Sequence, residues 1–250
     1  MSIDKIKSLK DYIPKEDTQQ IEFLKRYPNY DGRGVLIAVI DDGIDISVPG
    51  MQYTSTNLPK VVDFFDCTGY KNVHTSTVQE TEANDFITGK SGRKLKDDKE
   101  KRQAYSKSYD EKRKQGKSVI DCVVWFDGQR WLACVDTSMG DNIQNVKVLT
   151  NYRDEYEFAY ATNENVFWIS IKNDGNLLEI GSTYGIHGTA VAYIAAAHFP
   201  NEPQRSGLAP GAQIFTIIVG AKCLKKALLK CIDMKVDIVN LSQKLLYLDE

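Results

Sequence analysis

The chain has 250 residues, 42% of them hydrophobic, and a formal net charge of −2 at pH 7. Such a chain is long and apolar enough to bury a sizeable core, and its near-neutral charge excludes the basic footprint of a nucleic-acid-binding protein. No stretch approaches the roughly 20 consecutive apolar residues of a membrane helix, and the first residues lack the apolar segment of a signal peptide. We therefore expect no nucleic acid or membrane as a partner, and a cytoplasmic location.

The cysteines and histidines are scattered. The five cysteines are Cys67, Cys122, Cys134, Cys223 and Cys231, and no two of them form a C-x-x-C pair. Their odd number and wide spacing argue against a disulfide framework and a zinc site, and favour a reducing compartment. The three histidines (His74, His187 and His198) are too far apart to indicate a metal site. We expect neither a metal nor another cofactor.

The first candidate site residue comes after a polar N-terminal segment. In this segment, 18–26 is expected to form a short helix and 31–34 a turn. An apolar, β-branched run at 37–40 then ends in Asp41, Asp42 and Gly43. Such a run is typical of a strand buried on both faces of a parallel sheet, and these strands present functional side chains at their carboxyl ends. This pattern makes Asp41 the leading catalytic candidate. Side chains alternate along a strand, so we expect Asp42 to face away as a hydrogen-bonding or surface group. Asp45 is expected to be structural.

The second candidate is His187, which stands between two glycines and directly before a run of small and apolar residues at 190–197. This run predicts a tightly packed helix with His187 at its N-terminus. An aspartate that orients and an imidazole that moves protons are two members of a serine triad, here in the order Asp, then His. We predict that Asp41 lies within roughly 2.6–3.2 Å of a ring nitrogen of His187. His74, in a polar loop, and His198, at the end of the helix, are expected to be inert.

The two candidates are 146 positions apart (187 − 41), too many for one crossover connection, so an inserted module is expected between them. A strand is expected at 59–65, and turn signals at Asp127-Gly128 and at 173–176 each lie between apolar runs and predict hairpins. The insert, over 49–180, is therefore predicted to be β-rich. Its stretch 90–117 is highly charged. It could be a basic binding arm, but mixed-sign runs are more typical of a solvated helix or a loose linker outside the core.

The remainder alternates between strand, helix and strand, with strands expected at 213–219 and 236–241 and a helix at 224–234. The predicted fold is therefore α/β, an incomplete parallel sheet with flanking helices that is interrupted by the β-rich insert. Three segments are expected. Residues 1–48 contain the first strand, residues 49–180 form the insert with its linker at about 90–117, and residues 181–250 continue the first domain.

Several motifs carry a resemblance to a known family. The segments 41–43, 187–192 and 207–212 resemble the subtilisin-like serine peptidases. The flanking segments 49–52, 60–69, 121–125, 173–178 and 198–200 are similar to the tripeptidyl-peptidase II branch of that family. The resemblance runs from about Pro14 to Leu241 and covers the amino-terminal part of the family's catalytic domain. It implies an incomplete subtilisin-like fold, with Asp41 and His187 as the acid and base of the triad.

The activity implied by the resemblance is that of a serine exopeptidase, which releases tripeptides from the free N-termini of peptides. The family's serine lies in a Gly-Thr-Ser-Met-like turn, and no such segment occurs between His187 and Glu250. No nucleophile is therefore assigned, and we expect the chain to be inactive alone. Ser242 is not a candidate, because Asn240-Leu241-Ser242 matches the strand that lines the substrate groove and lacks the exposed turn of a nucleophile. Asn240 and Ser242 are instead candidate groove residues.

A further departure concerns the acidic residues that meet the substrate's ammonium group in the family. In the family these acidic residues follow two strands, which end in this chain at Gly220 and Ser242. The segments that come next in this chain, 221–223 and 244–248, contain no acidic residue. The alternative is thus a non-catalytic, peptidase-like binding or regulatory protein. A transcript that continues in frame past Glu250 into a Gly-Thr-Ser-Met-like segment would favour the peptidase. Peptides are the expected substrates, and homo-oligomerisation is left open.

Overall fold

The computed structural model describes residues 13–76, 78–79, 86–88, 94–96, 104–110, 119–137, 146–161, 165–220 and 223–242. The chain forms two compact units. One comprises the residues up to Thr68 together with those from Ser182 onward, and the other comprises Gly69–Gly181.

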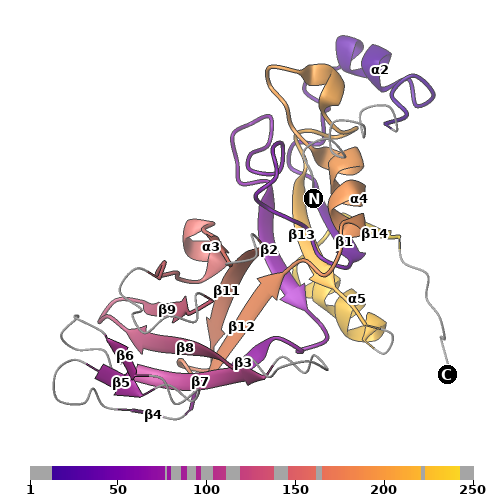
Figure 1. Cartoon of the computed structure of the whole chain (residues 1–250). Helices are drawn as coiled ribbons and strands as arrows, with labels where there is room; N and C mark the ends of the chain where they lie inside the picture. The colour runs from indigo at the N-terminus through magenta and orange to yellow at the C-terminus, as the bar shows by residue number, and fades with distance from the viewer. Residues whose placement is uncertain are drawn as a thin grey trace. The chain divides into compact units, whose positions relative to one another are not determined.

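The first unit is built on a four-stranded parallel sheet (Figure 1). Its strands are β1 (Leu36–Asp41), β2 (Val61–Asp66), β13 (Gln213–Ile218) and β14 (Ile238–Leu241), in the order β14-β1-β13-β2. Every residue of β1 after Leu36 is buried, as expected for a strand covered on both faces. The α/β fold class and the strands predicted from the apolar runs are therefore confirmed, with bounds shifted by a residue or two.

The helices of this unit are α2 (Gln20–Arg26), α4 (His187–Ala196) and α5 (Leu224–Asp233), with a short 3₁₀ helix η2 (Pro203–Arg205). Of these, α4 and α5 pack against the sheet. On α5, Ala227 and Cys231 pack against Ala38 and Ile40 of β1. Because side chains alternate along a strand, Asp41 points to the opposite face, where α4 lies.

The helix α4 begins at His187, as predicted from the small-residue run that follows this histidine. Its first turn contains Gly188, whose N–H donates to the Asp42 carboxylate at 2.8 Å. This contact with a distant segment satisfies one of the unpaired N–H groups at the helix start. The predicted helix start is therefore held in place by a contact with a segment that is distant in the sequence.

The segment 49–68 groups with the first unit. The strand β2 pairs in parallel with β13, with a register shift between Ile214 and Phe215. The parallel sheet therefore takes up a segment that the sequence analysis assigned to the insert. Local alternation predicted this strand at 59–65 but carried no information on its partner, because pairing joins residues about 150 positions apart. The domain boundaries themselves stay a prediction.

The second unit is rich in β-structure. One sheet has the order β10-β11-β12-β3, from Ala159–Tyr160, Val166–Lys172, Leu177–Ser182 and Asn72–His74. A second has the order β4-β7-β8-β9, from Val78–Gln79, Ala104–Asp110, Val119–Phe126 and Trp131–Val135. A third pairs β5 (Phe86–Thr88) with β6 (Lys94–Lys96), and α3 is a short helix at Tyr152–Glu155.

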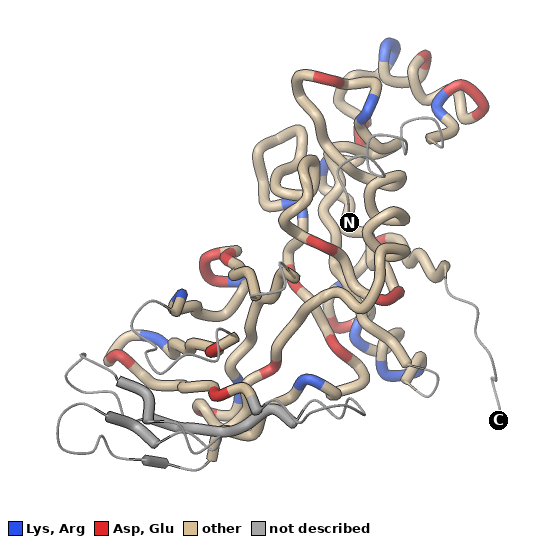
Figure 2. Tube along the Cα trace, in the orientation of Figure 1, with Lys and Arg blue, Asp and Glu red and all other residues tan. Residues whose placement is uncertain are grey.

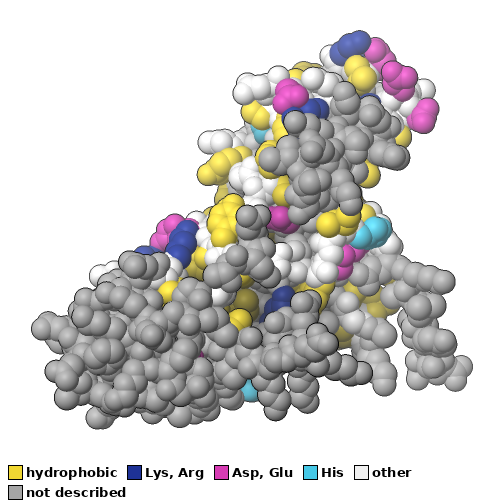
Figure 3. Space-filling view, viewed as in Figure 1, with side chains coloured by type: hydrophobic (Ala, Val, Ile, Leu, Met, Phe, Trp, Pro, Cys, Tyr) yellow, Lys and Arg dark blue, Asp and Glu magenta, His cyan; other side chains and the backbone are white. Residues whose placement is uncertain are grey.

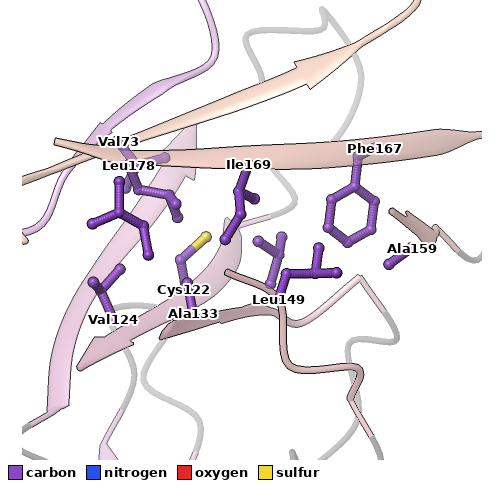
Figure 4. Close-up of a cluster of buried hydrophobic side chains, with 11 residues drawn as sticks. Val73, Cys122, Val124, Ala133, Leu149, Ala159, Phe167, Ile169 and Leu178 are labelled. Carbon is purple, nitrogen blue, oxygen red and sulfur yellow. The ribbon is translucent and has the colours of Figure 1, made fainter. Parts of the chain in front are cut away.

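Both predicted hairpins are present in this unit. The strands β8 and β9 pair around the turn at Asp127-Gly128, and β11 and β12 are sheet neighbours joined by a turn in which the Asn176 N–H donates to the Asn173 carbonyl. Both four-stranded sheets contribute apolar side chains to one core. Figure 4 shows Phe167 and Ile169 of β11 facing Ala133 of β9 and Leu149.

The expectation of a solvated helix or loose linker over 90–117 is wrong where the structure describes this stretch. The strand β7 pairs antiparallel with β8 from Tyr105 to Asp110, and β6 pairs with β5. The rest of the stretch lies outside the described residues. The high charge of this stretch did not predict its secondary structure, because a strand next to β8 forms backbone hydrogen bonds whatever its side chains are.

Among the described residues, no helix is long and apolar enough to cross a membrane. The helix α2 is charged, with Glu22, Lys25 and Arg26, and it also carries the half-exposed aromatic rings of Phe23 and, just after its end, Tyr27. Figure 3 shows charged and hydrophobic side chains together over this helix.

Candidate active site

The carboxyl end of β1 brings the two leading candidates together. The Nδ1 atom of His187 lies 2.9 Å from both carboxylate oxygens of Asp41. The two residues come from the end of a buried strand and the start of a helix. The expected distance is therefore met. A proton on Nδ1 is donated to Asp41, which leaves Nε2 as the acceptor of the neutral ring.

The two partners differ sharply in exposure. The Asp41 side chain is 1% exposed, whereas that of His187 is 57% exposed. Asp41 is held in place by a second donor, the Asp42 N–H at 2.8 Å. The hydrogen bond from His187 to Asp41 raises the pKa of the imidazole, with burial opposing and the charges of Asp41 and Asp42 adding to the rise. A buried carboxylate thus orients an imidazole whose other side is open to solvent.

Asp42 does not face away from His187, which corrects the sequence-based expectation. Its Oδ1 accepts the N–H of Gly188, the residue after His187, and its carbonyl accepts the Tyr184 N–H at 2.9 Å. Burial raises the pKa of Asp42, and the charge of Asp41 adds to this rise. The alternation argument failed because β1 ends at Asp41, so the period of two does not extend to the next residue. The glycine after His187 was the signal that could have revealed this contact.

The glycines of both motifs are required by close packing. A Cβ on Gly188 would lie 2.4 Å from the Gly43 carbonyl oxygen and 2.9 Å from the Asp42 Oδ1, and one on Gly185 would lie 2.1 Å from the Asp42 Oδ2. Gly43 has a φ of +97°, which favours glycine. The strand end and the helix start therefore approach each other so closely that side chains there are excluded.

The other acid of this loop is Asp45, which accepts hydrogen bonds from the Ser47 N–H at 2.9 Å and the Ser47 hydroxyl at 2.7 Å. It is a turn-forming group, as expected. His74 is not in a loop, because it ends β3 and pairs with Leu177. His198 follows α4 after two residues, and burial lowers its pKa. The structure brings neither histidine to Asp41.

The groove candidates Asn240 and Ser242 lie on and just after β14. Asn240 is the register partner of Val39 in β1, so it lies on the face of the sheet to which Asp41 points. The Ser242 hydroxyl donates to the Asn240 Oδ1 at 2.7 Å, and Ser242 is exposed. In the described part of the sheet β14 is an edge strand. In the same part of the chain, no group of three or more His, Cys, Asp or Glu side chains could hold a metal ion.

The class of protein follows from comparison with known families. The profile of the Subtilase family of peptidases (Peptidase_S8) matches residues 32–243. The chain therefore belongs to the subtilase family, and the motif-based resemblance is confirmed at this level.

Particular relatives narrow the likeness. The chain is 31% identical to tripeptidyl-peptidase 2 of Caenorhabditis elegans, over 92% of this chain and 23% of the relative, and 30% identical to that of Oryza sativa subsp. japonica, over 94% and 24%. A crystal structure of tripeptidyl peptidase 2 has a TM-score of 0.70 at 20% identity, over 88% of this chain and 24% of that chain. The chain is thus similar to tripeptidyl-peptidase 2 and spans about a quarter of the length of these curated relatives.

Proposed function

We propose that this chain supplies the aspartate and histidine of a serine-peptidase triad that hydrolyses peptides from their free N-termini. The observation that carries the proposal is the Asp41 carboxylate 2.9 Å from His187 Nδ1, with the opposite side of the ring exposed. The similarity to tripeptidyl-peptidase 2 supports tripeptide release as the form of the reaction. Peptides are the corresponding substrates. The cytoplasmic location stays a prediction.

The chemistry is acyl transfer. Nε2 of His187 would take the proton of a serine hydroxyl as its oxygen attacks the peptide carbonyl, and would then return that proton to the leaving amine. Asp41 would hold the ring in the Nδ1–H form and stabilise the imidazolium. The serine and the oxyanion donor are not assigned to any residue of 1–250. We therefore propose that these 250 residues alone do not turn over peptides.

Two measurements test this proposal. The purified 250-residue chain is assayed with an N-terminally free tripeptide-fluorophore, and the Asp41→Ala, His187→Ala double variant is the control. We expect no difference between the two proteins. Turnover that disappears in the double variant would contradict the claim that residues 1–250 lack a nucleophile. It would direct the search first to Ser242, the hydroxyl nearest to the candidate groove.

The second measurement is the sequence of the transcript beyond the codon for Glu250. If a Gly-Thr-Ser-Met-like segment follows in frame, the protein extended to include it is assayed with the same substrate. His187→Ala should then reduce turnover on the order of 10⁶-fold and Asp41→Ala roughly 10⁴-fold, the losses seen when single triad members are removed. An extended protein that remains active with His187→Ala would refute the triad role.

A second candidate function is a non-catalytic peptide-binding module. It is favoured by β14, an edge strand on which Ile238 and Val239 are about half exposed. An extended peptide can add a strand to such an edge through backbone hydrogen bonds. Fluorescence anisotropy with a labelled peptide, on the 250-residue chain and on its His187→Ala variant, tests this function, because a module that binds without catalysis should bind the peptide equally in both proteins.

A further inference from the structure

Two thiols meet at the same end of the parallel sheet as the candidate active site. Cys67 directly follows β2, and its N–H donates to the carbonyl of Ile218 at the end of β13. Cys223 caps the start of α5. Cys223 packs against the cluster of buried side chains that contains Cys67, and both residues are free thiols. They come together although they are 156 positions apart (223 − 67).

The backbone links this thiol pair to Asp41. The N–H of Val219, one residue past β13, donates to the Asp41 carbonyl at 3.2 Å. The next residue is Gly220, whose N–H donates to the Cys223 sulfur at 3.1 Å. The same sulfur lies 3.4 Å from the Gly220 carbonyl oxygen. A change at Cys223 therefore acts on a segment that is hydrogen-bonded to the strand end carrying Asp41.

The two thiols are unequal in their access to solvent. Cys67 is 7% exposed, and burial, followed by the interaction with Cys223, raises its pKa to about 12, with the charge of Lys226 opposing. Cys223 is half-buried and stands at the start of a ten-residue helix that carries several basic residues (Figure 2). Oxidation of a cysteine requires that the oxidant can reach its sulfur. Cys223 is thus the thiol that an oxidant reaches first, and Cys67 is the buried neighbour placed to react next.

We propose that Cys67 and Cys223 form a reversible oxidation site, which a hydroperoxide converts into an intramolecular disulfide. The Cys223 thiolate attacks a peroxide oxygen, the O–O bond breaks, and Cys223 becomes a sulfenic acid while the peroxide leaves as an alcohol or, from hydrogen peroxide, as water. The Cys67 sulfur then attacks the sulfenic sulfur. The S–S bond forms, the S–O bond breaks, and hydroxide leaves with the Cys67 proton as water. Two thiols are oxidised by two electrons and one peroxide is reduced.

Such a disulfide would tie the end of β2 to the start of α5 and displace the Cys223 sulfur from Gly220. In a reducing compartment a bond of this kind is transient and acts as a redox sensor rather than as a permanent structural link. The site therefore has the properties of a switch on the connection beside Asp41, and a dithiol reductant restores the free thiols.

The second unit contains a natural internal control. Cys122 on β8 and Cys134 on β9 are on neighbouring strands, but Cys134 pairs in register with Val123. The two sulfurs therefore point to opposite faces of their sheet, and they belong to different clusters of buried side chains. Cys122 and Cys134 should therefore not form a disulfide, because their side chains do not face each other although their strands are neighbours.

The experiment treats the purified full chain with hydrogen peroxide at a stoichiometric amount, blocks the remaining thiols with N-ethylmaleimide and maps peptides by mass spectrometry. We expect one cross-linked peptide pair, Cys67 with Cys223, that dithiothreitol releases, while Cys122 and Cys134 are alkylated. Alkylation of both Cys67 and Cys223 after treatment would overturn the proposal. A Cys122–Cys134 link formed to the same extent would also overturn it, because oxidation would then not depend on facing side chains.

Single variants separate the two roles. In Cys67→Ser, Cys223 should accumulate as a sulfenic acid that dimedone traps, and in Cys223→Ser the thiol of Cys67 should stay reduced. Circular dichroism and thermal unfolding verify that each variant is folded, and Cys231→Ser, on the same helix, serves as the matched control that still forms the disulfide. Oxidation of Cys67 in the folded Cys223→Ser variant at the wild-type rate would refute the assignment of Cys223 as the attacking thiol.

Discussion

The two ends of the parallel sheet hold charged groups in opposite ways. At the amino end, Lys60 precedes β2 with none of its surface exposed, and its ammonium group donates to the carbonyls of Pro210 and Ala212 at 2.7 and 2.8 Å. At the carboxyl end, Asp41 is equally buried, but its partner His187 is exposed.

This difference separates a structural charge from a reactive one. Burial lowers the pKa of Lys60 to about 7, with the charge of Asp31 opposing, and its known partners are backbone groups that cannot react. At the carboxyl end the hydrogen bond to Asp41 raises the pKa of an imidazole whose side chain is 57% exposed. A titratable group with a perturbed pKa indicates a functional site only when one of its atoms remains available to a ligand.

The largest expected effect is at the amino end. Lys60→Met keeps the volume of the side chain but leaves the carbonyls of Pro210 and Ala212 buried without their donor. We expect the free energy of unfolding to fall by about 3 kcal/mol. Urea unfolding followed by far-ultraviolet circular dichroism measures it, because the three tryptophans all lie in the second unit.

The control for that variant is Lys25→Met, which removes an exposed ion pair with Glu22 at 2.7 Å. Its effect should stay below about 0.5 kcal/mol. If Lys60→Met were no more destabilising than this control, Lys60 would not be the structural charge described above.

The next largest effect is expected at Gly188→Ala. Alanine normally stabilises a helix relative to glycine by up to about 1 kcal/mol. Here the new methyl group would meet the Gly43 carbonyl oxygen, so we expect destabilisation by about 1–3 kcal/mol instead. The sign of the change in a thermal or urea unfolding experiment is therefore decisive, and a stabilised variant would show that the strand end and the helix start are not in close contact.

A smaller effect, on acidity rather than on folding, is expected for Asp41→Asn. The amide can still accept the hydrogen bond from Nδ1 but carries no charge, so the pKa of His187 should fall. NMR titration of the His187 ring measures it. Because the folded-state pKa is raised, the stabilisation from this pair is present below the unfolded pKa and is lost as pH rises through the folded pKa. The difference in the free energy of unfolding between the wild type and Asp41→Asn should therefore become smaller as the pH rises through the folded-state pKa of His187. A difference that stays constant with pH would contradict the pairing of Asp41 with His187.

The smallest effect is expected for Asp42→Asn. Its Oδ1 can still accept the Gly188 N–H, so the fold is kept, and the pKa of His187 should fall less than in Asp41→Asn. Asp45→Asn is the matched control, because Asp45 accepts its hydrogen bonds from Ser47. It should leave the His187 titration unchanged. Equal shifts in the Asp42→Asn and Asp45→Asn variants would mean that Asp42 acts only through the net charge of the loop.

Much of the candidate site could be predicted because its signals are local. The apolar run before Asp41 identifies a buried strand by composition alone, and the Gly-Ile-His-Gly segment before a small-residue helix identifies a close approach. The direction of Asp42 could not be predicted in this way. It depends on where β1 ends, and that is decided by the pairing of β1 with β13 and β14.

Residues whose environment is unusual for their type could not be predicted from the local sequence either. Lysine is almost never fully buried, so nothing in the sequence around Lys60 predicted a buried ammonium held by two carbonyls. The charged strand β7 was missed for a related reason, because its place in the sheet comes from β8 and not from its own apolar pattern.

The sequence by itself therefore determined the class of fold, the strand that ends in Asp41 and the helix that begins near His187, since periodicity and composition act over neighbouring residues. The tertiary structure alone decided that Asp42 holds the helix start, that Lys60 is buried and that Cys223 packs against the cluster containing Cys67. These contacts join segments 146 to 156 positions apart, and the geometry that brings them together is a property of the packed sheet and not of any one segment.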